Sequence, residues 1–159
     1  MKASNGTMKT DTQFSVFLAN KPAVLAKVCQ RLAADKINIV AMSMMDSTEH
    51  GVLRLVAEDS SRARESLATV DAPTAETTVL MATLPNRPGA LADVVERLAA
   101  SHIGVNYAYC TTGAPGGKTV GVFRVADLKK AEKILGERQP RRKEPVAKVR
   151  KVAGPKRTK

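Results

Sequence analysis

Apolar residues along this chain recur with two periods, one typical of strands and the other typical of helices. Residues 14–18 predict a strand, and residues 37–45 and 51–57 predict two more, which are close enough to pair as a hairpin. Between the first two strands, one face of a predicted helix carries Val24, Leu25, Val28, Cys29 and Leu32. A second helix follows, for which Asp59 or Ser60 is the predicted N-terminal cap.

The second half of the chain repeats this order of elements. Residues 74–84, which are rich in Thr and Val, are suited to close the first unit and open the second as one long strand. The helix that follows carries its apolar stripe on Ala90, Leu91, Val94, Val95 and Leu98. Residues 103–110 and 119–125 predict two strands, and residues 127–136 predict the last helix.

The repetition extends to the sequence itself. Residues 18–39 and 84–105 align at an offset of 66 without a gap, and 11 of the 22 paired positions are identical. The sequence Gly-Val-Leu-Arg ends at Arg54, and the similar sequence Gly-Val-Phe-Arg ends at Arg124. This similarity predicts that the two arginines occupy matching strand positions. Repeats at this spacing mark duplicated structural units. We therefore predict an α+β fold of two βαββαβ units, with helices on one face of antiparallel sheets.

The repeats divide the chain into four predicted segments. These are a disordered N-terminus at 1–12, a first domain at 13–76, a second domain at 77–137 and a basic flexible tail at 138–159. The last strand of the second unit is not clearly marked, because residues 145–152 alternate apolar and basic residues only in part. This segment is either an edge strand or part of the tail, and the flanking prolines favour the tail.

The net charge of +11 is concentrated in the tail. Residues 138–159 hold ten Lys and Arg against one acid, Glu144, whereas the remaining 137 residues hold 16 basic and 14 acidic groups. A flexible basic arm of this kind binds phosphate backbones without sequence preference and with steep salt dependence. The alternative is a solubilising tail without a partner, and the composition does not separate the two.

Two further features predict the compartment. The chain has two cysteines, Cys29 and Cys110, which we interpret as free thiols in a reducing cytosol. The first 13 residues lack the apolar run of a signal peptide, and no apolar stretch approaches the length of a membrane span. We expect a cytoplasmic protein with no membrane partner.

Candidate catalytic residues are scarce. His50 falls in a predicted turn and His102 follows a helix, and neither lies in a spacing typical of a nucleophile–base pair or a metal site. Surface histidines are the simpler interpretation. We therefore expect no enzyme, no metal and no cofactor.

Several other side chains stand out along the strands. Tyr107 and Tyr109 are two apart and face the same side, which favours packing under the helices or at a dimer interface over contact with a ligand. Met42, Met44 and Met45 are interpreted as adaptable core. None of these residues receives a predicted role in a site.

The turn at Asn86, Arg87, Pro88 and Gly89 carries more chemistry. A helix is predicted to begin here, and the first turn of a helix presents unpaired N–H groups and the positive end of the dipole. Such ends bind carboxylates and phosphates, and Gly89 lets a ligand approach the backbone. The amide of Asn86 can pair with an ammonium or a carboxylate, so a small zwitterion fits. The alternative is an ordinary strand-to-helix turn, and the turn taken alone favours that alternative.

Both units resemble ACT domains, which are small regulatory ligand-binding modules. The residues that carry the resemblance are Asn20-Lys21-Pro22-Ala23-Val24-Leu25-Ala26 with Ile37-Asn38-Ile39, and Asn86-Arg87-Pro88-Gly89-Ala90-Leu91-Ala92 with Ile103-Gly104-Val105. The resemblance covers about residues 14–136. It implies ferredoxin-like domains that associate side by side, bind amino acids against the turn before the first helix, and regulate an enzyme or a transcriptional response.

Two departures from the family pattern suggest how a site is shared. Ala23 replaces the expected Gly in the first unit, and Gly104 stands where the first unit has Asn38. The turn of the second unit and Asn38 of the first are therefore candidate complementary halves of one site. The candidate ligand-binding residues are Asn86, Arg87, Pro88, Gly89, Ala90, Leu91 and Asn38, together with Asn20, Lys21, Pro22 and Ala23.

These patterns lead to one function and one alternative. The first is a regulatory protein, expected to be a homodimer, that binds a free amino acid as effector and acts in trans on a separate enzyme or other protein. The alternative is an assembly module whose basic tail at 138–159 binds nucleic acid.

Overall fold

The computed structural model describes residues 8–19, 23–45, 50–114 and 118–136 of the chain. The elements in these residues are β1 (Met8–Ala19), α1 (Val24–Ala34), β2 (Ile39–Met45), β3 (His50–Ala57), α2 (Ser60–Ala68), β4 (Thr74–Pro85), α3 (Ala90–Ala100), β5 (Val105–Ala114), β6 (Lys118–Val125) and α4 (Leu128–Gly136). Within these ranges, no helix is long and apolar enough to span a bilayer.

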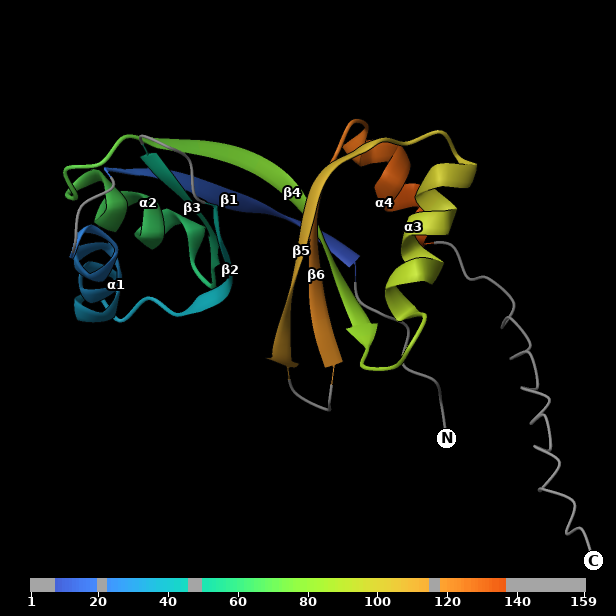
Figure 1. Cartoon of the computed structure of the whole chain (residues 1–159), viewed down its shortest axis with the longest axis horizontal. Coiled ribbons are helices and arrows are strands. Elements are labelled where there is room, and N and C mark those ends of the chain that lie inside the picture. The colour runs from blue at the N-terminus through green and yellow to red at the C-terminus, as the bar shows by residue number, and fades with distance from the viewer. Residues whose placement is uncertain (1–7, 20–22, 46–49, 115–117, 137–159) are drawn as a thin grey trace, which may run out of the picture.

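The strands form one antiparallel sheet in the order β2-β3-β1-β4-β6-β5. In the first unit, β1 lies between β3 and β4; in the second, β4, β5 and β6 take the places of β1, β2 and β3. Figure 1 shows α1 and α2 at one end of the molecule and α3 and α4 at the other, with the strands between them. This confirms the predicted α+β class with two ferredoxin-like units, whose sheets are joined into one.

The two units share their central strands, β1 and β4, which run through both halves of the molecule (Figure 1). The predicted domain boundary at 76/77 falls inside β4. Thr12 of β1 pairs with Thr78 of β4, and these residues are separated by 66, the offset of the sequence repeat. An approximate two-fold axis that relates the units therefore passes through this pair.

The expected disordered N-terminus is wrong for residues 8–12, which form the first part of β1. Met8 to Asp11 pair with Val79 to Ala82 of β4, where the last strand of the second unit would otherwise lie. Met8 also packs against the core of that unit. An open edge on β4 would leave a row of unpaired N–H and C=O groups, so a polar segment is drawn into the sheet despite its composition.

The sequence left the segment at 145–152 open as either an edge strand or part of the tail. The place beside β4 that an edge strand of the second unit would take is filled by the start of β1. The tail at 138–159, including this segment, lies outside the described residues.

The sequence match between Arg54 and Arg124 is wrong by two residues. Leu55 pairs with Phe14, and Phe123 pairs with Leu80, which is the equivalent of Phe14 at the offset of 66. Phe123 therefore takes the place of Leu55, so the offset between β3 and β6 is 68. A shift of two leaves every side chain on the same face, so the hydrophobic pattern cannot reveal it.

Two apolar cores lie between the helices and the sheet, one in each unit. The first is built on Phe14, Val16, Leu18, Val28, Leu32, Leu53, Leu55 and Leu67. The second is built on Leu80, Leu84, Val94, Leu98, Ile103, Phe123, Val125 and Leu135. A smaller buried cluster occupies the opposite, helix-free face: Ala41, Val56, Val79, Met81 and Val122.

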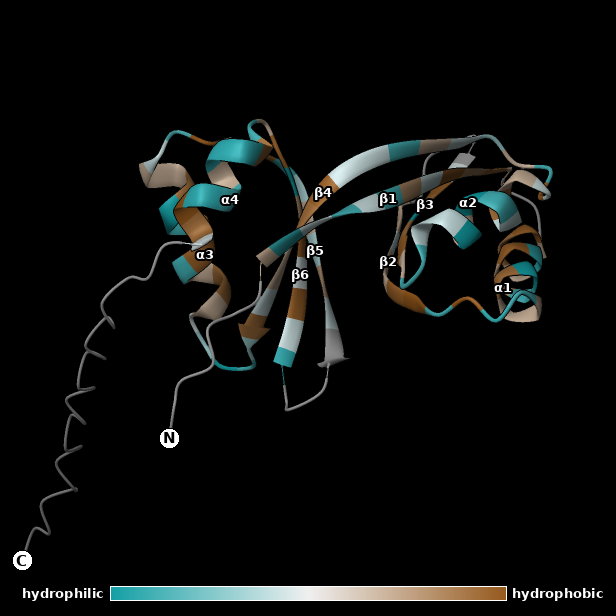
Figure 2. Ribbon diagram, turned by 180° about the vertical axis from the view of Figure 1, so that it is seen from behind, coloured by the Kyte–Doolittle hydropathy of each residue, from teal (hydrophilic) through white to brown (hydrophobic). Residues whose placement is uncertain are grey.

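The helix-free face is partly enclosed because the two edge strands, β2 and β5, also lie in contact with each other. Figure 2 shows β2 coloured as hydrophobic although it is an edge strand. Met42, Met44 and Met45 of β2 are exposed, so their interpretation as core residues is wrong. The reason is the strand order, which places β2 at the edge of the sheet with β3 as its single hydrogen-bonded neighbour in the described chain.

Candidate functional site

The predicted turn of the second unit connects β4 to α3 on the molecular surface. The Arg87 N–H donates to Pro85 O at 2.9 Å, and the Ala90 N–H donates to Arg87 O at 3.3 Å. Asn86, Arg87, Pro88, Gly89 and Leu91 are exposed, whereas Ala90 is buried against the core. The turn therefore offers its backbone to solvent while Ala90 anchors it to the core.

Gly89 caps α3 in the left-handed conformation, with φ 83° and ψ −12°. This conformation favours glycine, and a Cβ built there would lie 3.6 Å from Arg87 Nη1. In the described part of the chain, no side-chain cap is present at the start of α3. The helix start is therefore open to an external acceptor.

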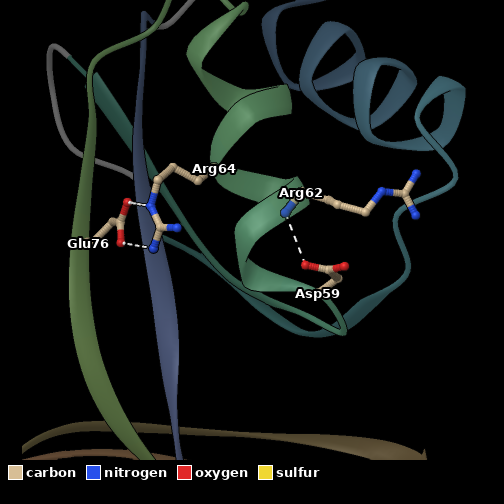
Figure 3. Close-up of polar contacts among 4 residues, drawn as sticks. All are labelled: Asp59, Arg62, Arg64 and Glu76. Atoms are coloured by element: carbon tan, nitrogen blue, oxygen red, sulfur yellow. Dashed lines mark hydrogen bonds and ion pairs between the residues drawn. The ribbon is translucent and has the colours of Figure 1, made fainter.

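The other helix of each unit begins differently. The Asp59 carboxylate accepts a hydrogen bond from the Arg62 N–H at 3.0 Å at the start of α2, and Asp127 accepts from the Lys130 N–H at 2.9 Å in α4. Figure 3 shows the Asp59 cap beside the pair formed by Arg64 and Glu76. Asp59 is thereby confirmed as one of the two predicted caps. An aspartate carboxylate thus caps the start of α2 and of α4, whereas the N-cap residues of α1 and α3 make no side-chain cap.

Arg87 adds a positive charge beside the open start of α3. Its Nη1 donates to Pro88 O at 3.1 Å and its Nη2 pairs with the Asp93 carboxylate at 2.8 Å. Both side chains are largely exposed, so this ion pair adds little to stability. It does hold the guanidinium over the turn, next to the positive end of the helix dipole.

In the first unit, Asn20, Lys21 and Pro22 lie outside the described residues. Ala23 caps α1 with φ 72° and ψ −8°, close to the angles of Gly89, and α1 also lacks a side-chain cap. The turn therefore keeps its backbone shape at this residue and adds a methyl group. A left-handed conformation costs a residue with a side chain about 1–2 kcal/mol.

Asn38 lies at the opposite end of α1, just before β2. Its Nδ2 donates to Glu58 Oε2 at 3.4 Å, and its carbonyl accepts from the Glu58 N–H at 3.0 Å. It borders an open, polar cleft of about 530 Å³ lined by Lys36, Ile37, Asn38, Glu58, Asp59, Ser60 and Arg62. In the second unit, Gly104 makes the matching backbone contact with Ala126 at 3.0 Å.

The two candidate halves keep separate polar partners within the chain. Asn38 bonds to Glu58, and Arg87 bonds to Pro88 and Asp93. The sequence predicted that Asn38 and the turn share one site, because Ala23 replaces Gly in the first unit and Gly104 stands in the place of Asn38 in the second. The polar contacts of a single chain remain local to each.

Sequence reasoning missed a polar cluster on the helix-free face. Gln13 is fully buried there; its Nε2 donates to Tyr107 Oη at 2.8 Å, and its Oε1 accepts from Tyr109 Oη at 3.0 Å. The two tyrosines share a face as predicted, but the Gln13 contacts place them opposite the helices. Burial, with a smaller contribution from Tyr107, raises the pKa of Tyr109 above its ordinary value. The partners are more than 90 residues apart in the chain, so no local pattern signals the cluster.

The remaining predicted features are readily located. Cys29 is half-buried and Cys110 is exposed, and both are free thiols. Across the ranges that the structure describes, no three His, Cys, Asp or Glu side chains are grouped as metal ligands.

Comparison with known proteins identifies similar sequences and folds. The profile of the family described as ACT domain pair matches residues 9–141. Protein BT0572 from Bacteroides thetaiotaomicron is 29% identical, with a TM-score of 0.74 over 84% of this chain and 90% of that one. No curated protein sequence gives a significant match.

Two regulatory subunits of aspartate kinase share the fold at lower identity. The ligand-free subunit from Thermus thermophilus is 14% identical, with a TM-score of 0.60 over 85% of this chain and 97% of that one. The subunit from Thermus flavus is 16% identical, with a TM-score of 0.56 over 84% and 94%. At these identities, the likeness is one of fold.

Proposed function

This chain belongs to the ACT domain pair family, and we propose that it is a regulatory protein that binds a free amino acid and acts on a separate partner in trans. Membership of the family and the fold shared with proteins named as regulatory subunits support this function. The partner is proposed to be an enzyme or another protein, because the candidate site is suited to binding rather than to catalysis.

The observation that carries the proposal is the open start of α3. Asp59 and Asp127 cap α2 and α4, whereas Gly89 leaves the first turn of α3 without a side-chain acceptor. The carboxylate of an amino acid would accept hydrogen bonds from N–H groups in the first turn of α3. The Asp59 carboxylate accepts the Arg62 N–H in this way in α2. Arg87 would strengthen this binding through its charge.

The groups around the turn also suit the rest of the ligand. The side-chain carbonyl of the exposed Asn86 is an acceptor for an ammonium group. Leu91 and Val95 are 44% and 40% exposed, one helical turn apart on α3, and offer apolar contacts to an aliphatic side chain. An aliphatic amino acid is therefore the proposed effector class.

We propose that a second copy of the chain completes the site. Asn38 precedes β2 of the first unit and the turn precedes α3 of the second, and each bonds to local partners within one chain. The two halves are therefore proposed to meet across a homodimer. The exposed stripe of Leu91 and Val95 lies beside the turn and is suited to such an interface. In this arrangement the turn of the second unit and Asn38 of the partner subunit would contact the same ligand.

A thermal-shift screen of the full chain against the twenty amino acids tests the proposal. A ligand that binds only the folded state adds about 2.7 kcal/mol of stability at a hundredfold excess over its Kd. We expect one or a few aliphatic amino acids to raise the Tm, and Gly89→Val to abolish the rise.

Gly104→Val is the matched control, because a Cβ at Gly104 meets no atom within 4 Å. It should keep the ligand-induced rise. Arg87→Met, which leaves the backbone of the turn unchanged, should weaken it. No rise with any amino acid, or an equal rise in the Gly89→Val protein, would refute binding at this turn.

The charge of the tail favours a second candidate function. With ten Lys and Arg against one acid, residues 138–159 are suited to bind a nucleic-acid backbone while the ACT pair serves as an assembly module. Removing these residues separates the two functions. Effector binding survives under the first proposal, whereas salt-sensitive binding to DNA or RNA is lost under the second.

A further inference from the structure

Arg54 lies half-buried near the middle of β3, on the helix-free face of the sheet. Its Cζ is 4.3 Å from the centroid of the Tyr107 ring, and its Nη1 contacts Met45 Sδ. Tyr107 is itself fixed by its hydrogen bond from the fully buried Gln13. The guanidinium is therefore held in place by a stack whose base is anchored in the interior.

No carboxylate neutralises Arg54 within the described part of the chain. The ion pairs there use Asp11, Asp35, Glu76 and Asp93, and each of these acids pairs with another cation. Asp11 is the acid that the alternation of β1 places on the same face, and Lys9 Nζ lies 2.7 Å from it. A half-buried guanidinium without a counter-ion favours the binding of an anion.

An exposed apolar row adjoins this cation. The strand registers align Phe17, Val52 and Met45 across β1, β3 and β2, next to the row of Ser15, Arg54 and Ser43. Phe17 is 39% exposed and Met45 is 50% exposed. The face thus presents a cation flanked by two hydroxyl-bearing residues, followed directly by apolar surface.

We propose that this surface binds a small monocarboxylate with an apolar tail. We call it the Arg54 patch, and it consists of Ser15, Phe17, Ser43, Met45, Val52 and Arg54. The planar guanidinium pairs with the carboxylate of the ligand through two parallel hydrogen bonds, and the apolar tail of the ligand covers the row of Phe17, Val52 and Met45. Met45 is flexible and adapts to the shape of the tail.

The ligand class differs from that of the turn before α3. Within the described residues, Asp11 is the acid on this face, and it is paired with Lys9 rather than free to accept an ammonium group. A zwitterionic amino acid would leave its ammonium without a partner. The Arg54 patch is therefore a second site, independent of the proposed amino-acid site.

The chain contains a natural reporter for this site. It has two tyrosines and no tryptophan, and both tyrosines belong to the cluster beneath Arg54. Tyrosine emission therefore reports on the helix-free face, while neither tyrosine belongs to the turn or to α3. Binding at the two sites is separable by this signal.

Titration of the full chain with phenylacetate, followed by tyrosine emission, tests the proposal. We expect a saturable change. Acetate has the charge without the tail, and phenethylamine has the ring with the opposite charge. Each should bind at least about tenfold more weakly than phenylacetate, because each loses one of the two interactions.

Matched arginine variants locate the binding. Arg54→Met should weaken phenylacetate binding at least about tenfold. Arg124→Met removes the other half-buried arginine of this face, whose Nη1 bonds to Val125 O at 3.4 Å, and should leave binding unchanged. Arg54→Lys keeps the charge without the fork and should bind with intermediate affinity, which also covers the case in which Arg54→Met does not fold.

Three results would overturn the proposal: no saturable change with phenylacetate, equal binding of phenethylamine, or equal loss in the Arg54 and Arg124 variants. Gly89→Val, which disrupts the proposed amino-acid site, should bind phenylacetate normally. The failure of one proposal is therefore distinguishable from the failure of the other.

Discussion

At the scale of single residues, the two units build the same turn from different side chains. Ala23 and Gly89 both cap their helices in the left-handed conformation, at φ 72° and φ 83°. The repeat predicts this equivalence, because the two residues align at the offset of 66. Sequence alone left open whether Ala23 changes the turn; the structure shows that it keeps the backbone angles of a glycine.

Ala23→Gly is expected to stabilise the protein. It relieves a left-handed alanine, which costs about 1–2 kcal/mol, and adds about 0.5–1 kcal/mol of chain entropy to the unfolded state. The net gain is about 0.5–1 kcal/mol, measured by urea unfolding. Gly89→Ala is the reciprocal control and should destabilise by a similar amount. A loss of stability in Ala23→Gly would contradict the assigned conformation.

Tyr109 provides a prediction about alkaline pH. Because burial disfavours the phenolate, the pKa of Tyr109 in the folded protein lies above the unfolded value of about 10. Its contribution to stability is therefore complete below about pH 10 and is lost as the pH rises through the folded-state pKa.

A Tyr107→Phe variant leaves Tyr109 as the single tyrosine, so tyrosinate absorbance follows it directly. We expect a midpoint above pH 10 in the native protein and near 10 in concentrated urea. Equal midpoints in the two conditions would show that Tyr109 is not buried as described.

At the scale of elements, helices and caps followed from local signals. The spacing of apolar residues predicted α1 and α3, and the Asp59 signal predicted the start of α2. The start of β1 escaped prediction because Met8 to Thr12 are mostly polar, and their strand conformation depends on pairing with β4. The equivalence of residues in β3 and β6 was not predicted correctly, because a shift of two residues leaves each side chain on the same face of the sheet.

Deletion of residues 1–12 is expected to destabilise the second unit although they belong to the N-terminus. It removes the ladder between Met8–Thr12 and Thr78–Ala82, and each hydrogen bond contributes about 1 kcal/mol. Amide hydrogen exchange in β4 should accelerate at Val79 to Ala82. Deletion of residues 1–7 is the control and should change little. Unchanged protection after the longer deletion would contradict the shared-strand arrangement.

At the scale of the whole molecule, the duplication predicted two units but not their union. Sharing β1 and β4 places the units about a two-fold axis at Thr12 and Thr78, and brings β2 and β5 into contact. The helix-free face with its Gln13 cluster is a product of this long-range arrangement. The candidate turn is a continuous segment and could be predicted from sequence. The Arg54 patch combines residues of β1, β2 and β3, so it could not.

Binding of an amino acid at the open start of α3 underlies the proposed function. Isothermal titration calorimetry with the effector found in the screen tests it most directly, on the full chain and on Gly89→Val. We expect one ligand per chain and no binding to the variant. Two equal ligands per chain, or binding that survives Gly89→Val, would contradict it.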